Sequence, residues 1–487
     1  MTRWARAIAA CLMMTALRAQ APDLEAARAH DARGLALAEA GNIADALQEF
    51  RQALRAAPVF PDARYHLALA HNALGQTDEA MAELEEALRL RPDFLLARYQ
   101  LAACCRKRGD FEGESRLLAE TTQQAPDFAE AHYNFGLSLQ DRDKPADAVE
   151  QLRAAFRLEP KNPRFALALG VALAGRDPAE ATSVLRRLIG LAPNDPEAHY
   201  NLALAMAATG NEDDAIHEFL AALGLNPNHG GARRSLGIAL MHADRLKESA
   251  EQLQRAVAIS PRDAETANNL GMVLLRLKDV GGAVAVLETA VSLNPKLIKA
   301  HFNLSQAYLR AGRADDARRA SDRAAALTKE QRDMGRAMVL VQSARQKLQG
   351  SDTAAAIALL REAIEAHPGF VDAYMELGRA LLDSGGDPAG AIQQFRTALN
   401  LDPERADAHY YAGMALRKKG DLPHAFEELK AAATMAPCHV EMIRALAAAA
   451  IDAGNRPEAV RQLRRVLAWD PRDTNASAAL ERAARLP

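Results

Sequence analysis

Cysteine has the most specific chemistry of any residue type in this chain, and two of its four cysteines are adjacent. Cys104 and Cys105 form a vicinal pair, whereas Cys11 and Cys438 lie far from it. No pair has the spacing of a zinc site, and no Cys-x-x-Cys-His haem motif occurs. Neighbouring residues of a helix point about 100° apart, so the vicinal thiols do not bridge easily. We therefore expect Cys104 and Cys105 to be reduced residues of a helical core.

Histidine is the second candidate for chemistry, because it recurs in front of an aromatic residue. The four examples are His132, His199, His301 and His409. They occur once per repeat unit, whereas metal ligands must converge on one point, so we expect packing residues and no metal. The chain has no Walker loop, no dinucleotide fingerprint and no Gly-x-Ser-x-Gly motif. We predict a chain without catalytic residues or cofactors, and hence not an enzyme.

The elements that position these residues follow from a regular spacing of prolines. Residues 196–227 read as two helices, because Gly210 can end the first and Pro227 must end the second. Equivalent prolines recur 33 to 35 residues apart, except for one gap of 73 residues that holds two units. They are Pro58, Pro92, Pro126, Pro160, Pro193, Pro227, Pro261, Pro295, Pro368, Pro403, Pro437 and Pro471. Such a period indicates a repeat array.

The period gives about 13 helix–turn–helix units between residues 27 and 471, each expected to contact only its neighbours. Unit three is the least regular, with Glu114 and Thr121 in columns that are normally small and apolar. Residues 472–487 alternate alanines with charged residues, which predicts a C-terminal capping helix over Trp469.

Small residues occupy two columns of the repeat, one in each helix. The columns are Gly34, Gly136, Gly170, Gly237, Gly271, Gly378 and Gly413, and then Ala46, Ala80, Ala148, Ala215, Ala283, Ala317, Ala425 and Ala459. With the prolines, this pattern closely resembles the tetratricopeptide repeat family. The resemblance implies an all-α fold, a right-handed α-solenoid whose first helices line a concave groove. We expect units one to nine over residues 27–331 and units ten to thirteen over residues 332–471.

A column of amide side chains is expected to face that groove, with aromatic rings beside it. It contains Asn134, Asn201, Asn269 and Asn303, next to Tyr133, Tyr200 and Phe302. Asparagine offers a donor and an acceptor, so the column can pair with the backbone of an extended peptide. It resembles the asparagine ladder in the repeat arm of O-linked N-acetylglucosamine transferases, although Ala168 and Ser235 interrupt it and the catalytic domain is absent. Hydrogen bonding between helices, with no ligand, is the alternative.

A longer first helix is expected near residues 328–348. Thr328 and Gln331 have the spacing of a capping box, which predicts a helix start at this point. The segment reads either as a hinge or as a plain insertion. Residues 299–347 carry eleven Lys or Arg against five acids, a net charge of +6. This basic region is either a solvated helix face or a surface for an acidic partner or anionic lipid.

Residues 1–19 have the layout of a secretory signal peptide, with Arg3 and Arg6 before an apolar stretch and Ala19 at the cut. We therefore expect a periplasmic or secreted protein; an uncleaved leader on a cytoplasmic protein is the alternative. Removing Arg3, Arg6 and Arg18 changes the formal charge from −3 to −6, which disfavours nucleic acid as a partner. No apolar run reaches the length of a membrane span.

These features predict a non-enzymatic scaffold that binds a protein or peptide in its groove. The alternative is an accessory subunit of a glycosyltransferase or of a surface-polymer assembly or export complex. The sequence identifies neither the partner nor the oligomeric state.

Overall fold

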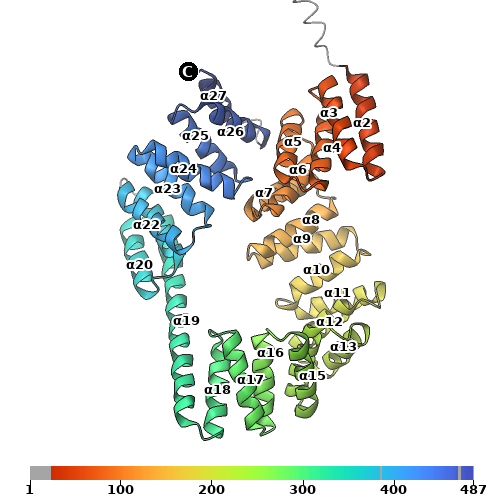
Figure 1. The fold of residues 1–487 in the computed structure, drawn as a ribbon, viewed down its shortest axis with the longest axis vertical. Coiled ribbons are helices and arrows are strands. Elements are labelled where there is room, and N and C mark those ends of the chain that lie inside the picture. The colour runs from red at the N-terminus through yellow and green to blue at the C-terminus, as the bar shows by residue number, and fades with distance from the viewer. Residues whose placement is uncertain (1–22, 384–386, 470–472, 486–487) are drawn as a thin grey trace, which may run out of the picture. The chain divides into compact units, whose positions relative to one another are not determined.

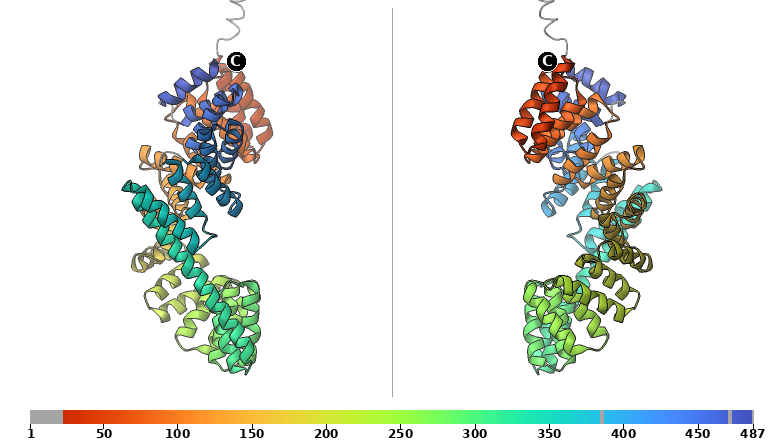
Figure 2. Two further views of the ribbon diagram at one scale, coloured as in Figure 1. Left: turned by 90° about the vertical axis from the view of Figure 1, so that its left-hand side faces the viewer. Right: turned by 90° about the vertical axis from the view of Figure 1, so that its right-hand side faces the viewer.

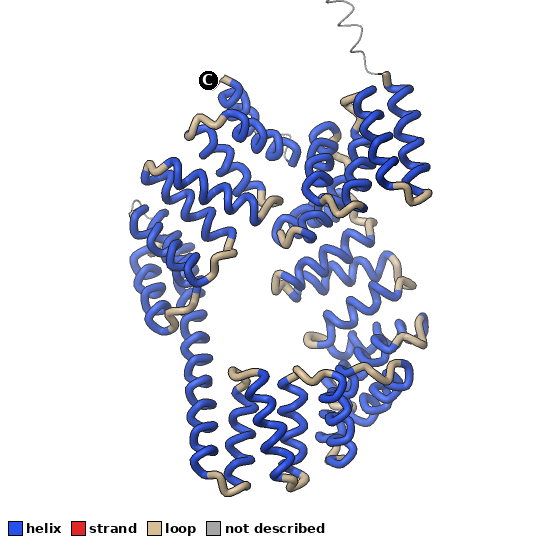
Figure 3. The backbone as a smooth tube through the Cα atoms, viewed as in Figure 1, coloured by secondary structure: helices blue, strands red, loops and turns tan. Residues whose placement is uncertain are grey.

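The computed structural model describes residues 23–383, 387–469 and 473–485. Within these ranges the secondary structure is helical throughout, and no strand occurs in this part of the chain (Figure 3). The prediction of an all-α solenoid is confirmed. Among the described helices, none is both long and apolar enough to cross a membrane. The proposed signal peptide, residues 1–19, lies outside the described residues.

The chain divides by its contacts into two compact units. Unit 1 comprises Met1–Pro126 together with Leu381–Pro487, and unit 2 comprises Asp127–Ala380. In its first segment unit 1 contains α2 (Leu24–Glu39), α3 (Ile43–Ala56), α4 (Pro61–Ala73), α5 (Thr77–Leu90), α6 (Leu95–Lys107) and α7 (Phe111–Gln124). In its second segment it contains α22 (Pro388–Leu401), α23 (Ala406–Lys419), α24 (Leu422–Met435), α25 (Val440–Asp452), α26 (Arg456–Trp469) and α27 (Thr474–Ala484).

Unit 2 is a continuous run of helix pairs (Figure 1). It contains α8 (Ala129–Asp141), α9 (Pro145–Leu158), α10 (Pro163–Ala174), α11 (Pro178–Leu191), α12 (Pro196–Ala208), α13 (Glu212–Leu225), α14 (Gly230–His242), α15 (Leu246–Ile259), α16 (Ala264–Arg276), α17 (Val280–Leu293), α18 (Ile298–Arg310), α19 (Ala314–Gln349), α20 (Thr353–Ala366) and most of α21 (Val371–Asp383).

The pair α12 and α13 shows how the sequence sets the helix ends. Pro196 occupies the first turn of α12, where its missing N–H costs nothing, and the Asp195 carboxylate accepts a hydrogen bond from the Glu197 N–H. The helix stops before Gly210, whose φ of +78° is a left-handed conformation that glycine adopts readily. Helix α13 ends before Pro227, as the proline period predicts.

Close approach of the paired helices explains the small-residue columns. Ala203, Ala215 and Ala222 are fully buried in the core of unit 2, with Phe219 between them. At Gly271 an added Cβ would lie 2.4 Å from a carbon of Leu287 on the partner helix, so only glycine fits. The small residues therefore set the distance between helices, and the large apolar residues fill the space beside them.

The predicted helix start at Thr328 is wrong. Thr328 lies inside α19, a single helix of 36 residues that joins the second helix of unit nine to the first helix of unit ten (Figure 2). The Thr328 hydroxyl donates a hydrogen bond to the Ala324 carbonyl oxygen of the preceding turn and does not cap a helix. Because unit nine lacks its closing proline, nothing interrupts the backbone hydrogen bonds of α19. The domain boundary at residue 331 stays a prediction.

The expectation that both vicinal cysteines are reduced is also wrong. Cys105 forms a disulfide with Cys438, while Cys104 is a buried free thiol. Both residues do lie in the helical core, as the repeat register predicts, but the register does not show that Cys438 lies beside Cys105. The disulfide joins two segments of unit 1 that are 333 residues apart in the sequence.

A related correction concerns contacts between repeats. We expected each unit to contact only its neighbours, but α26 packs against α5 within unit 1. The C-terminal capping helix is confirmed as α27, whose Ala476 and Ala483 are buried in a cluster that includes Leu463 and Trp469.

Candidate functional site

The candidate site is a face of unit 2 formed by successive first helices. Helices α10, α12, α14, α16 and α18 each contact the next one in this series. Their side chains therefore form continuous columns across the repeats. We use the name first-helix face for the surface that contains Asn201, Asn269, Phe302, Asn303 and Leu309.

Two of the predicted asparagines use their amide donors within the protein. The Asn303 Nδ2 donates to the Asn268 Oδ1 at 2.9 Å, which links α18 to α16, and Asn268 is only 2% exposed. The Asn201 Nδ2 donates to the Glu197 carbonyl oxygen of its own helix at 2.8 Å. Asn303 thus makes a hydrogen bond between helices, which is the alternative that the sequence leaves open.

The other two asparagines differ from each other. Asn269 is half-buried, and its side chain has no hydrogen bond within the described part of the chain. Asn134 is also half-buried but already interacts within the chain. Asn269 therefore has both the donor and the acceptor of its amide available to a ligand.

The aromatic residues also separate into two kinds. The Tyr133 ring packs against Phe165 with ring centres 5.0 Å apart, and Tyr200 packs against His229 at 4.7 Å. These tyrosines fill space between repeats. Phe302 is 58% exposed, and Leu309, two turns along the same helix, is 56% exposed. Together they form an exposed apolar spot on α18, next to Asn269 and Asn303 in the repeat register.

A pocket of about 430 Å³ lies at the start of α18. Its walls are mainly apolar and include Leu297, Ile298, Leu327 and Met334. Lys299 also lines the pocket, as do Lys296 and Glu330, whose charged groups are 3.8 Å apart. The pocket can accept an apolar side chain, and charged groups are among the residues that line it.

Much of the charge in the basic region 299–347 is paired. Lys329 is 3.0 Å from Asp333, Arg313 is 2.7 Å from Asp316, and Arg345 is 2.8 Å from Glu376. Arg310 donates to the Leu275 carbonyl oxygen, a contact between adjacent first helices. These contacts favour the solvated, ion-paired surface over a concentrated anion-binding patch.

The histidines pack as the sequence predicts. In His199 the Nδ1 is 2.7 Å from a Glu218 carboxylate oxygen on the second helix, and the Nε2 is 3.1 Å from the Pro193 carbonyl oxygen. His409 makes the same two contacts with Glu428 and Pro403. Each ring thus ties its first helix to its second helix and to the preceding proline. Within the described residues, no group of three or more His, Cys, Asp or Glu residues could hold a metal ion.

Comparison with protein families decides the identity of the repeats. Models described as tetratricopeptide repeat match most of the chain. The matched segments are residues 3–58, 32–93, 73–134, 133–196, 171–229, 200–264, 236–298, 274–340, 342–399 and 384–437. The chain belongs to the tetratricopeptide repeat family. A search of curated proteins gives no significant match to this tetratricopeptide repeat protein.

Solved structures with similar repeats share little sequence with this tetratricopeptide repeat chain. A chain of the APC/C hetero-tetramer Cut9–Hcn1 is 18% identical with a TM-score of 0.35, over 92% of this chain and 95% of that one. MamA from Desulfovibrio magneticus RS-1 is 26% identical with a TM-score of 0.32, over 34% and 97%. YrrB, described as a TPR protein with an unusual peptide-binding site, is 18% identical with a TM-score of 0.31, over 38% and 95%. At these TM-scores, the likenesses define neither the arrangement of the repeats nor the ligand.

The sequence did not reveal the contacts between the two segments of unit 1. They involve Asp110, Arg116 and Glu85 in the first segment, and Cys438 and Arg465 in the second. One signal was present, because Glu114 and Thr121 mark unit three as irregular, and α7 of that unit carries Arg116. Irregular columns can therefore mark a repeat that contacts something other than its neighbours.

Proposed function

We propose that this tetratricopeptide repeat protein is a non-enzymatic scaffold that binds an extended segment of a protein partner on the first-helix face of unit 2. The observation that carries the proposal is the exposed pair Phe302 and Leu309, close in register to the unbonded amide of Asn269. The rings and aliphatic chains supply apolar contact area, and the amide supplies a donor and an acceptor for a peptide backbone.

Site-specific photo-cross-linking tests this proposal. A photoreactive amino acid replaces Phe302 on α18 in one variant, and Leu220 on α13 in the control. Leu220 is 51% exposed, so it matches Phe302 in accessibility but lies on a second helix. We expect a defined protein cross-linked to position 302 and absent at position 220. Equal labelling at both positions, or none at position 302, contradicts the proposal.

The same experiment separates the scaffold from the alternative function. If the cross-linked protein is a glycosyltransferase or a polymer-export component, the accessory-subunit function is favoured. A partner with no catalytic domain favours the general scaffold.

We also propose that the protein works outside the cytoplasm. Two features support this: the basic, apolar and small-residue order of residues 1–19, and the Cys105–Cys438 disulfide, since disulfides persist in oxidising compartments. Amino-terminal sequencing of protein from the native host should find Gln20 as the first residue. Protein that retains Met1 contradicts export by cleavage.

A further inference from the structure

The disulfide in unit 1 lies inside a set of specific contacts. Cys105 is on α6, and Cys438 is in the loop between α24 and α25. Their Cα atoms are 6.0 Å apart, and both residues are fully buried. A reductant in solution therefore reaches the sulfur atoms only when the surrounding contacts open.

The backbone on both sides of Cys438 is held by side chains of the first segment. The Asp110 carboxylate accepts from the Gly113 N–H with one oxygen and from the Cys438 N–H with the other, both at 2.8 Å. The Arg116 guanidinium donates to the Cys438 carbonyl oxygen at 2.8 Å. Side chains of the first segment thus bind both the backbone N–H and the backbone carbonyl oxygen of Cys438.

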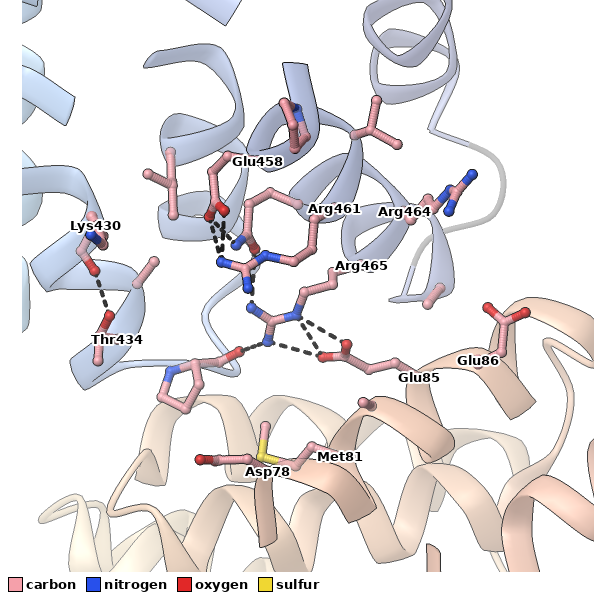
Figure 4. A pocket seen from close by; sticks show the side chains of 18 of the residues that line it. Asp78, Met81, Glu85, Glu86, Lys430, Thr434, Glu458, Arg461, Arg464 and Arg465 are labelled. Carbon is pink, nitrogen blue, oxygen red and sulfur yellow. Dashed lines mark hydrogen bonds and ion pairs between the residues drawn. The ribbon is translucent and has the colours of Figure 1, made fainter. Parts of the chain in front are cut away.

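A second contact joins α26 to α5. Arg465 makes two hydrogen bonds of 3.0 Å to the Glu85 carboxylate and donates to the Pro437 carbonyl oxygen, beside Cys438 (Figure 4). The indole N–H of Trp469 donates to the same carboxylate at 3.1 Å. The Arg116 guanidinium lies 4.8 Å from the centre of the Trp469 ring, which connects the two contacts.

Gly113 is the residue that allows Cys438 to approach. A Cβ at this position would lie 2.3 Å from the Cβ of Cys438, so any other residue would push the loop away. Gly113 lies in the first turn of α7, so a positive φ is not the reason for a glycine at this position. Its function is to leave space for Cys438.

Two apolar clusters of unit 1 each lie within one segment. The cluster around Phe50 draws on the first segment, and the cluster around Leu463 draws on the second. Between α5, α24 and α26 lies a pocket of about 620 Å³, lined by Met81, Glu85 and Arg465 (Figure 4). Polar side chains and the disulfide contribute to the contact between the two segments.

We propose that Cys105 and Cys438 form a redox-sensitive latch that holds α24–α26 against α5–α7. In the reducing step, a dithiol forms an S–S bond between its own sulfurs while the Cys105–Cys438 bond breaks. Two electrons pass to the cysteines, and the two protons of the dithiol end on their sulfur atoms. Once the disulfide is reduced, the segment with Cys438 loses its covalent link to the first segment and separates from it.

The fluorescence of Trp469 measures whether the contact between the two segments is closed or open. The chain has two tryptophans, so replacing Trp4 by phenylalanine leaves Trp469 as the sole emitter in the full-length protein. Peptide mapping without reductant should first recover the peptides of Cys105 and Cys438 linked to each other. Dithiothreitol should then shift the Trp469 emission to longer wavelength and increase the radius of gyration, and reoxidation should reverse both changes.

Two variants open the latch without reductant. Gly113→Ala should prevent pairing by excluding Cys438, and Cys438→Ser should remove the bond without a steric clash. Gly335→Ala is the control for glycine replacement, because a Cβ at Gly335 meets nothing within 4 Å. Cys104→Ser is the control for thiol removal, because Cys104 is unpaired.

We expect Gly113→Ala and Cys438→Ser to show the Trp469 emission of the reduced protein. The two controls should show the Trp469 emission of the oxidised protein. All four variants should have the same helix content by circular dichroism. The proposal is overturned if no Cys105–Cys438 peptide is found. It is also overturned if reduction and Cys438→Ser both leave the Trp469 emission and the radius unchanged, since the contact would then hold without the disulfide.

Discussion

Asn269 and Asn303 occupy the same column of the repeat but bond differently. The Asn303 amide satisfies the buried Asn268, whereas the Asn269 side chain has no hydrogen bond within the described part of the chain. A sequence column therefore does not assign one role to all its members. The repeat register predicts the column, but the bonding of each amide depends on the residue that the neighbouring helix presents.

This difference gives a prediction for binding and stability. Asn269→Ala should weaken binding of the partner by about 1 kcal/mol, a roughly fivefold loss of affinity, and leave the melting temperature unchanged. Asn303→Ala should lower the free energy of unfolding by about 1–3 kcal/mol, because it leaves the buried Asn268 side chain without its donor. Calorimetric titration and thermal unfolding of both variants measure the two effects. Equal loss of stability in both would show that Asn269 is structural.

The Cys104 thiol should be unreactive in the folded protein. Burial raises the pKa of its thiol, although a hydrogen bond from Asn72 acts in the opposite direction. Because the thiolate is the nucleophile, little of the reactive form exists near pH 8. We expect iodoacetamide to modify Cys104 only after denaturant is added, as measured by mass spectrometry. Rapid modification in the native state would show that the helix holding Cys104 opens readily.

At the scale of a helix pair, the small-residue column should be sensitive to single methyl groups. Gly271→Ala places a Cβ 2.4 Å from Leu287, and we expect the overpacking to cost about 1–3 kcal/mol. Gly335→Ala, in the open middle of α19, should instead stabilise by about 0.5–1 kcal/mol. Chemical unfolding of both variants checks the sign of each change. Similar effects at both sites would mean that the column does not set the helix spacing.

The helices were predictable because their signals are local. Pro196 and Gly210 mark the ends of α12, and Ala215 and Phe219 mark the buried side of α13. The capping-box pattern at Thr328 failed for an equally local reason. A threonine can bond to the carbonyl oxygen one turn earlier, and no proline forces the helix to stop there.

At the scale of the molecule, the contact between α5 and α26 was not predictable. The proline period shows which helices are neighbours in a stack, because each repeat buries its apolar face on the next. It does not show which repeats far apart in the sequence lie in the same compact unit. The pairing of Cys105 with Cys438 depends on such a contact within unit 1.

The disulfide should raise the stability of the whole chain toward complete unfolding. It closes a loop of 333 residues, which by chain entropy corresponds to about 5–6 kcal/mol at most. The full effect requires the loop to be unfolded, so it should appear in the last unfolding transition and not in earlier ones. Unfolding of the wild type and of Cys438→Ser in guanidinium chloride measures the difference. Identical last transitions would contradict this account.

The separation of Cys105 and Cys438 also sets an order of events during biosynthesis. The second cysteine follows the first by 333 residues, so at roughly 5–20 residues per second the first thiol waits roughly 17–67 s for its partner. Throughout that interval the nascent chain carries two adjacent thiols, Cys104 and Cys105, of which only Cys105 forms the native disulfide. Correct pairing therefore requires the nascent repeats to fold first and bury Cys104, which leaves Cys105 for the last part of the chain to arrive.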